Sequence, residues 1–189
     1  MSAHPAEISQ NERQSVKFFD NHYFYSPYDT QSVKTILELP SGNIHSFTQV
    51  EPTTKSGDGL TYGPYNNIPA NTHQELIVHF VHDEGFLDVT RLKHEVEVSH
   101  WGNIAIEDLM HWTNAGALLK GGFSRLDYQT KPTSYGVIRD VEFGLPKGAF
   151  DGYYRDHIGN ISTSRFNGQQ FLMVPRFPLF GGWKTKFCS

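Results

Sequence analysis

Apolar and polar residues alternate along several stretches of the chain, and this period of two constrains the fold more than any other feature. The clearest case is LKHEVEVS, where one set of alternate residues is apolar apart from a histidine: Leu92, His94, Val96 and Val98. The residues between them are charged or polar: Lys93, Glu95, Glu97 and Ser99. Because successive side chains of a strand point to opposite faces, this pattern predicts a half-buried β-strand.

The same alternation recurs elsewhere along the sequence. It is present in VKTILEL (33–39) and in YGVIRDVEF (135–143). The stretch ELIVHFVH (75–82) is almost continuously apolar, which is typical of a strand covered on both faces. In FLDVTRL the apolar register passes through Leu87 and Val89 and then switches to Leu92, which predicts a bulge or turn near Thr90 and Arg91.

Helical patterns are scarce. Only residues 104–120, IAIEDLMHWTNAGALLK, fit a short helix, and their first residues fit a strand equally well. Short apolar runs separated by glycine, proline and asparagine are typical of antiparallel β-sandwiches. We therefore expect an all-β fold, an antiparallel β-sandwich with few short helices.

The longest stretch without a clear period is Glu51–Thr72, EPTTKSGDGLTYGPYNNIPANT. An irregular run of this length is uncommon inside a compact domain, so it indicates a functional loop or a junction. We place a domain boundary directly after it. Residues 1–72 would hold the end of a first β-domain with this long loop, and residues 73–189 the start of a second β-sandwich domain.

Composition excludes several classes of function. The formal net charge is −4, which argues against nucleic-acid binding because that usually requires a concentrated basic face. No run approaches the roughly 18 consecutive apolar residues of a membrane span. The first ten residues, MSAHPAEISQ, lack the apolar region of a signal peptide. Cys188 is the single cysteine, which excludes an internal disulfide and a cysteine-rich metal site.

Ten histidines raise the question of a metal site. The stretch HEVEVSH resembles the helical zinc motif of metalloproteases, but that motif needs histidines four residues apart and position 98 is valine. On a strand, His94 and His100 share a face but lie about 20 Å apart, too far for one ion. We expect no metal and no other cofactor, and keep a zinc hydrolase as an alternative that metal analysis would test.

Paired carboxylates are the other candidate for catalysis. Glu95 and Glu97 lie about 7 Å apart on one strand face, within the range of a glycosidase acid/base pair. They share that face with Lys93 and have no apolar surroundings that would raise a carboxyl pKa. A solvated strand face is the better interpretation. No nucleophile elbow or phosphate-binding glycine loop is present, so we expect no catalytic residues.

Aromatic residues are dense in NHYFYSPY (21–28) and PRFPLFGGWKT (175–185). The favoured interpretation is structural: rings fill the middle of a sandwich while proline and glycine form its turns. The alternative is a carbohydrate-binding module that presents aromatic rings to sugars, with Trp101 and Trp183 as further candidates.

The stretch YYRDHIGNISTS (153–164) contains Asn160-Ile161-Ser162, an acceptor tripeptide for N-linked glycans. The residues before it suit a strand, and Gly159 and Asn160 tolerate the positive φ angles of a tight turn. We therefore expect Asn160 at the tip of a hairpin, where a transferase could reach it.

Six stretches, read in order, resemble one known family: NHYFYSPY, TYGPYNNIP, EVSHWGNIAIED, AGALLKGGFSRLDYQ, YYRDHIGNISTS and RFPLFGGWKT. The family is ribophorin I, an accessory subunit of the oligosaccharyltransferase complex that attaches N-glycans in the endoplasmic reticulum. The resemblance runs from about Pro5 to Lys186. SHWGNIA and RFPLFGGWKT are its most specific parts.

The resemblance implies a non-catalytic role on the lumenal side of the endoplasmic reticulum membrane, in which the protein would either scaffold the complex or present substrate. Its implied partners are the other oligosaccharyltransferase subunits, and nascent glycoprotein substrates beside them. Family members carry a signal peptide, two β-rich lumenal domains and one membrane span, and a glycosylated asparagine that corresponds to Asn160. Against that pattern, this chain is expected to be a partial lumenal fragment, without the signal peptide or the membrane span.

Overall fold

A computed structural model describes residues 1–130 and 135–188 of the chain. The described residues form two compact units, which are treated separately below: residues 1–8 with 12–83, and residues 9–11 with 84–188. Nearly all regular structure is strand, and the described residues contain one short helix, α1 (Arg125–Thr130). All strand pairings between the longer strands are antiparallel, so the predicted all-β fold class is confirmed.

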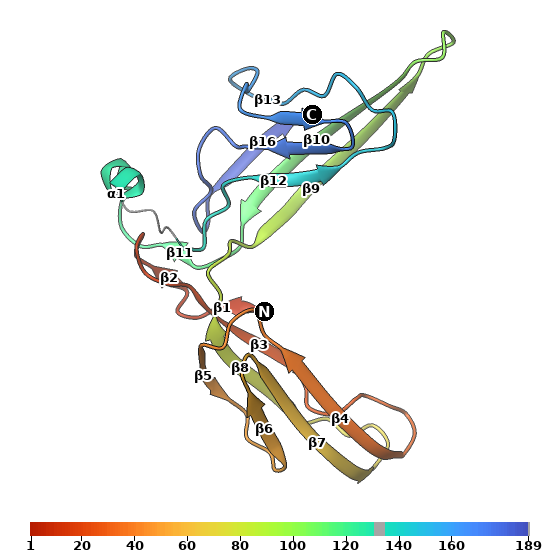
Figure 1. The fold of residues 1–189 in the computed structure, drawn as a ribbon, viewed down its shortest axis with the longest axis vertical. Helices are drawn as coiled ribbons and strands as arrows, with labels where there is room; N and C mark the ends of the chain where they lie inside the picture. The colour runs from red at the N-terminus through yellow and green to blue at the C-terminus, as the bar shows by residue number, and fades with distance from the viewer. Residues whose placement is uncertain (131–134, 189) are drawn as a thin grey trace. The chain divides into compact units, whose positions relative to one another are not determined.

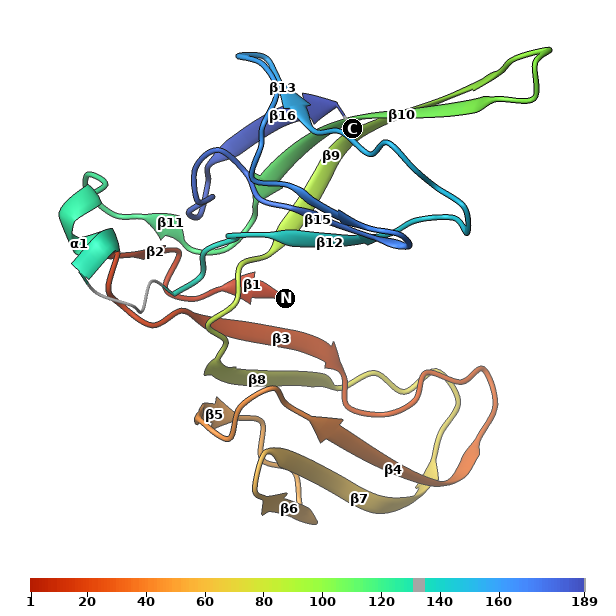
Figure 2. The ribbon, with the colours of Figure 1, turned by 45° about the horizontal axis from the view of Figure 1, so that its top comes forward.

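The first unit contains two antiparallel sheets (Figures 1 and 2). One sheet has the order β1-β3-β8-β5, with β1 (Ser2–Ala3), β3 (Ser15–Asn21), β8 (Glu75–Val81) and β5 (Ile44–Phe47). The other has the order β4-β7-β6, with β4 (Thr30–Glu38), β7 (Gly59–Ile68) and β6 (Thr53–Ser56). The short β2 (Glu7–Ile8) lies between β1 and β3 in the sequence.

Alternate residues of β7 and β8 build the core of the first unit. On β8, Leu76, Val78 and Phe80 are buried while Ile77 and His79 are half-buried, so the strand that was predicted to be covered on both faces is fully covered on one. On β7, Leu60 and Tyr62 are buried. The remaining core residues of this unit include Val16, Tyr65, Val81 and the imidazole of His22. Apolar burial along two facing strand sets is what holds a β-sandwich together.

The predicted irregular run at 51–72 is mostly strand, so that expectation was wrong. Residues of β6 and β7 pair in register from Thr53↔Tyr62 to Ser56↔Gly59, around a turn in which Gly57 has a φ of 56°. Gly63 and Pro64 lie where the β4–β7 register shifts, between the pairs Thr35↔Tyr62 and Val33↔Tyr65. A bulge tolerates residues that a regular ladder excludes, so these two mark a bulge within a strand.

The second unit also has two sheets (Figure 2). The first has the order β13-β16-β10-β9, with β13 (Arg155–Asp156), β16 (Lys184–Cys188), β10 (Ile104–Asn114) and β9 (Leu87–Val98). The second has the order β12-β15-β14, with β12 (Val141–Gly144), β15 (Gln170–Met173) and β14 (Arg165–Asn167). The short β11 (Leu118–Leu119) follows β10.

Aromatic rings fill the core of the second unit. Trp112 of β10 is fully buried, stacks on Phe143 with ring centroids 5.8 Å apart and meets Phe187 edge-on at 4.4 Å. The rest of the buried cluster combines residues of both sheets and of the segments between them: Met110, Ile138, Tyr154, Ile161, Phe171, Met173 and Leu179. Edge-to-face and offset ring pairs of this kind add to the stabilisation from burial alone.

The β9–β10 hairpin settles two further predictions. The pairs His111↔Arg91 and Trp112↔Val89 leave Thr90 as an extra residue, which confirms the predicted bulge. Residues 104–114 form a strand and not a helix. The expected half-burial of 92–99 was wrong, because β9 is exposed along its whole length. β9 lies at the end of the strand order, and the second layer covers β10 and β16 instead.

Candidate functional site

The outer half of the β9–β10 hairpin is the most prominent candidate surface. Val98 pairs with Ile104 and Val96 with Ile106, and directly opposed residues lie on the same face of an antiparallel pair. These four side chains are 44–70% exposed, although all are strongly apolar. Figures 1 and 2 show this half of the hairpin extending away from the rest of the second unit as a two-stranded ribbon. We call these four residues with Trp101 the ribbon face.

A short hydrogen-bonded turn closes the ribbon. The Ser99 amide donates to the Asn103 carbonyl at 2.8 Å, and the Gly102 amide donates to the Ser99 carbonyl at 3.0 Å. Gly102 has a φ of 89°, a conformation that side chains disfavour. The turn therefore holds Trp101 at the end of the ribbon, where it is 91% exposed.

Backbone groups along the ribbon edges are also available. β16 pairs with β10 only over Leu109–Thr113, and β9 is the last strand of its sheet. Among the described residues, the ribbon thus has two open edges along Ile104–Asp108 and along β9. An isolated two-stranded hairpin is marginally stable in water, and a contiguous exposed apolar face usually marks an interaction site. The ribbon has both properties.

The histidines and carboxylates singled out in the sequence lie on this ribbon. The His94 Nδ1 and the Asp108 Oδ1 are 2.6 Å apart on the apolar side of the ribbon. Glu95 lies on the opposite side, exposed, and forms an ion pair with Lys93 at 2.6 Å. Glu97 is exposed on the same polar side. The interpretation of these carboxylates as a solvated strand face agrees with this placement.

His100 lies in the ribbon turn beside Trp101 and is exposed. Within residues 1–130 and 135–188, the structure brings together no group of three or more histidine, cysteine, aspartate or glutamate side chains that could hold a metal ion.

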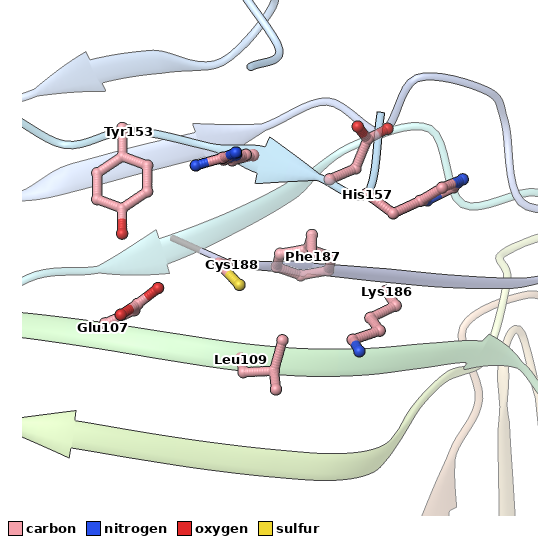
Figure 3. Close-up of a pocket in the computed structure, with 9 residues that line it drawn as sticks. Glu107, Leu109, Tyr153, His157, Lys186, Phe187 and Cys188 are labelled. Carbon is pink, nitrogen blue, oxygen red and sulfur yellow. The ribbon is translucent and has the colours of Figure 1, made fainter. Parts of the chain in front are cut away.

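A shallow pocket of about 240 Å³ lies on the polar side of the same sheet (Figure 3). Three strands line it, with two flanking residues: Glu107 and Leu109 of β10, Arg155 and Asp156 of β13, Lys186, Phe187 and Cys188 of β16, and Tyr153 and His157. The Tyr153 hydroxyl points toward Glu107 in Figure 3. Burial raises the pKa of Tyr153, and the negative charge of Glu107 and its hydrogen bond to the hydroxyl raise it further.

The carboxylates of this pocket are engaged in contacts within the chain. Glu107 bonds to Tyr153, and Asp156 accepts hydrogen bonds from Arg176 Nε at 2.7 Å and Nη2 at 2.9 Å. The Arg176 hydrogen bonds hold the pKa of Asp156 well below its usual range, against the opposing effect of burial. A carboxylate held ionised in this way stabilises the fold and is a poor proton donor.

Asp156 also fixes the turn that precedes the glycan acceptor. Its Oδ1 accepts hydrogen bonds from the amides of Ile158 and Gly159, both at 2.9 Å. The chain then returns with Asn160 opposite Arg155 in an antiparallel bridge. Asn160 therefore pairs at the end of the turn formed by residues 156–159, so its predicted place at the tip of the hairpin was wrong, and only Gly159 has the expected positive φ. Its side chain is exposed, as is Ser162, whereas Ile161 between them is buried.

The two aromatic stretches differ in burial. In PRFPLFGGWKT the rings contribute to packing: Phe180 is buried and contacts Trp183 at 5.3 Å, as the structural interpretation predicted. In NHYFYSPY that interpretation was wrong for three rings, because Phe24, Tyr25 and Tyr28 are 61–76% exposed. The neighbouring turn-forming residues Ser26, Pro27 and Asp29 were the available signal that this segment is a surface loop.

Sequence reasoning identified the strands of the ribbon but missed that its apolar face is uncovered. It also missed the pocket, which depends on the pairing of β13 with β16. No local pattern encodes the pairing of such distant segments.

The described residues define an all-β protein of antiparallel sheets, one of which carries an uncovered apolar hairpin. The particular family follows from comparison with known proteins: the family model of ribophorin I matches residues 1–189. The chain belongs to the ribophorin I family.

Curated relatives carry names that fit this assignment. The chain is 41% identical over 189 residues to dolichyl-diphosphooligosaccharide–protein glycosyltransferase subunit 1A of Arabidopsis thaliana, covering 97% of this chain and 31% of that protein. It is 39% identical to subunit 1B of Oryza sativa, with 97% and 40% covered. It is 40% identical to subunit 1 of Caenorhabditis elegans, with 97% and 32% covered. The chain thus spans about a third to two fifths of their length. No helix in the described residues is long and apolar enough to cross a membrane.

Proposed function

We propose that the chain is the non-catalytic, lumenal part of an oligosaccharyltransferase subunit in the endoplasmic reticulum membrane, and that it supports N-linked glycosylation by holding the complex together. Its partners are other subunits of the same complex, with nascent glycoproteins as substrates nearby. The names of the relatives support the process. The observation that carries the scaffolding role is the ribbon face.

The ribbon face has the properties of a contact between subunits. Val96, Val98, Ile104 and Ile106 form two directly opposed apolar pairs, and Trp101 is exposed in the turn at the end of the same hairpin. Aromatic anchors surrounded by aliphatic side chains dominate the energetics of protein interfaces. The charged reverse side, with Lys93, Glu95 and Glu97, keeps the ribbon soluble until the partner binds.

To test whether the ribbon face contacts a partner subunit, a charge is placed on one side of the ribbon or on the other. Ile104→Asp puts a carboxylate on the apolar face, and Ala105→Asp puts the same group on the polar face of the same strand. The tagged full-length protein is expressed in cells and its complex isolated in mild detergent. We expect Ile104→Asp to reduce recovery of the other subunits at least about tenfold, because burying an unpaired carboxylate costs several kcal/mol. Ala105→Asp should recover them normally.

Equal recovery with both variants would exclude the ribbon face as the contact. Absence of the unmodified protein from the complex would contradict the proposed function itself. Circular dichroism of the purified variants checks that each has kept its strand content.

We also propose that Asn160 accepts an N-linked glycan. Its exposure and its position after a fixed turn support this, whereas buried Ile161 indicates that transfer precedes folding of this segment. Glycosidase treatment of the cellular protein should increase its mobility, and Asn160→Gln should reduce that shift by the contribution of one glycan. An unchanged shift in Asn160→Gln would contradict the assignment.

A further inference from the structure

One end of the first unit carries three exposed rings in a single loop. The segment between β3 and β4 contains Phe24, Tyr25 and Tyr28, with 75%, 61% and 76% of each residue exposed. Aromatic residues are usually buried because each removes 150–250 Å² from water. Three exposed rings within five residues therefore call for a ligand or a partner.

This loop is held in place by the loop between β7 and β8. The Asn71 amide donates to the Ser26 carbonyl at 2.8 Å, and the Ala70 amide donates to Asp29 Oδ1 at 2.9 Å. At the base of the loop, the His22 amide donates to the Gln74 carbonyl at 2.7 Å. Figures 1 and 2 both show the two loops side by side. The backbone that carries the rings is thus fixed before any ligand arrives.

The base of the loop is also packed. The His22 ring is fully buried and lies 4.8 Å from the Tyr62 ring, 5.1 Å from Tyr65 and 5.0 Å from Tyr23. Burial lowers the pKa of His22, so this imidazole is neutral at pH 7. The loop that carries Phe24, Tyr25 and Tyr28 therefore begins from a packed base in which the histidine carries no charge.

A polar hollow of about 230 Å³ begins at the residue after Tyr28. It is lined by Asp29, Thr30, Gln31, Asn67, Ile68 and Pro69, where β4 starts and β7 ends. Its side chains offer a carboxylate, a hydroxyl and two amides, which together both donate and accept hydrogen bonds. The hollow is smaller than the roughly 300–1,000 Å³ of typical ligand sites. It suits one small polar unit of a ligand, and Tyr28, the exposed ring directly before it in the sequence, is the nearest candidate to contact the rest.

The charge around this site narrows the chemistry of the ligand. Neither loop, over residues 21–32 and 66–74, contains a lysine or arginine. Phosphate and carboxylate ligands are recognised mainly through such cations, so an anionic ligand does not fit. A neutral molecule rich in hydroxyls fits both the polar hollow and the exposed rings. Its hydroxyls would form hydrogen bonds with the amides and the carboxylate, and its apolar C–H faces would stack on the rings.

From this arrangement we infer that the loop end of the first unit binds neutral oligosaccharide, with Tyr28, Tyr25 and Phe24 as stacking surfaces and Gln31, Asn67 and Asp29 as hydroxyl partners. This role is independent of the ribbon face, which belongs to the other unit. The inferred ligand belongs to the same chemical class as the glycans that are transferred in N-linked glycosylation.

Saturation-transfer NMR on the 189-residue chain tests the inference with three probes: mannotriose, chitotriose and cellotriose. We expect at least one to bind with a Kd on the order of 1 mM, as an open site with few contacts allows. Tyr28→Ala and Gln31→Ala should each weaken binding at least about fivefold. Asn67→Gly should do the same, because it removes the amide while glycine retains the positive φ of 57° at this position.

The matched control is Phe150→Ala, which removes an equally exposed ring, 76%, from the second unit. It should leave binding unchanged. All four substitutions lie at exposed positions, and thermal melts confirm that the fold is kept. The inference would be overturned if none of the three probes bound with a Kd below about 10 mM. It would also be overturned if Phe150→Ala and Tyr28→Ala weakened binding equally. Preferential binding of a proline-rich peptide at the same residues would also overturn it. Because no other subunit is present, these outcomes are independent of the complex-recovery experiment.

Discussion

The two halves of strand β10 have the same residue pattern and opposite environments. In the inner half, Met110 and Trp112 are 7% and 0% exposed, and in the outer half Ile104 and Ile106 are 65% and 44% exposed. All four lie on one side of the strand, because their positions differ by even numbers. The difference arises from the second layer, since β12 and β15 contribute Phe143, Phe171 and Met173 over the inner half only.

Alternation thus specifies which residues share a face, whereas burial depends on what lies over that face. The inner half converts its apolar area into stability of the unit. The outer half leaves about 25 cal/mol per Å² of apolar surface to be gained when a partner covers it. One continuous hairpin therefore serves folding at one end and, as we propose, assembly at the other.

The largest expected effect comes from a matched pair of tryptophans. Trp112→Ala removes a buried ring that contacts Phe143 and Phe187, so it should lower the free energy of unfolding by about 3–5 kcal/mol. Trp101→Ala removes a ring from the ribbon turn that is 91% exposed and should change it by less than about 0.5 kcal/mol. Urea unfolding followed by circular dichroism measures both. Similar losses would show that the ribbon is packed against the rest of the unit in solution.

A smaller effect is expected from the ion pair between Asp156, whose side chain is buried, and Arg176, whose side chain is 37% exposed. Asp156→Asn breaks the paired hydrogen bonds from Arg176 and should cost about 1–3 kcal/mol at pH 7. The sign of the pH dependence follows from the lowered pKa of Asp156 in the folded state. Its contribution is fully present above the unfolded pKa of about 3.9 and is lost as the pH falls below that value.

The stability difference between wild type and Asp156→Asn should therefore shrink between pH 5 and the most acidic pH at which both proteins still fold. Urea midpoints of the two proteins across this range measure it, and titrations shared by both cancel in the difference. A difference that stays constant over this range would show that the carboxylate charge does not matter.

The same comparison shows which features of the fold were predictable from sequence. The strand at 87–98 and its bulge at Thr90 followed from alternation and from its interruption, because both are local consequences of side-chain direction. The long strand β7 was mistaken for a loop, because Gly63 and Pro64 are breakers in any local rule. They are tolerated there only because β4 shifts register at that point.

Prediction of the candidate sites had a similar limit. Asn160 was proposed from its tripeptide and the turn before it from Gly159, both local signals, but its expected place at the tip was wrong because it pairs with Arg155. The support of that turn by Arg176, twenty residues away, could not be read from the sequence. Nor could the exposure of Ile104, since the residues that would cover a strand face lie elsewhere in the chain and carry no mark of that contact.

The smallest expected effect separates stability from assembly on the ribbon face. Val98→Thr keeps a β-branched side chain of nearly the same shape and replaces a methyl group by a hydroxyl. Because Val98 is 70% exposed in the chain, the free energy of unfolding should change by less than about 0.5 kcal/mol. Recovery of the other subunits with the full-length protein should nevertheless fall, since an interface would bury that hydroxyl opposite Ile104 without a partner.

The melts are run at two protein concentrations. A loss above about 1 kcal/mol that grows with concentration would mean that the face already pairs with a second copy of the chain, and that self-association, not contact with another subunit, covers the outer half of the hairpin.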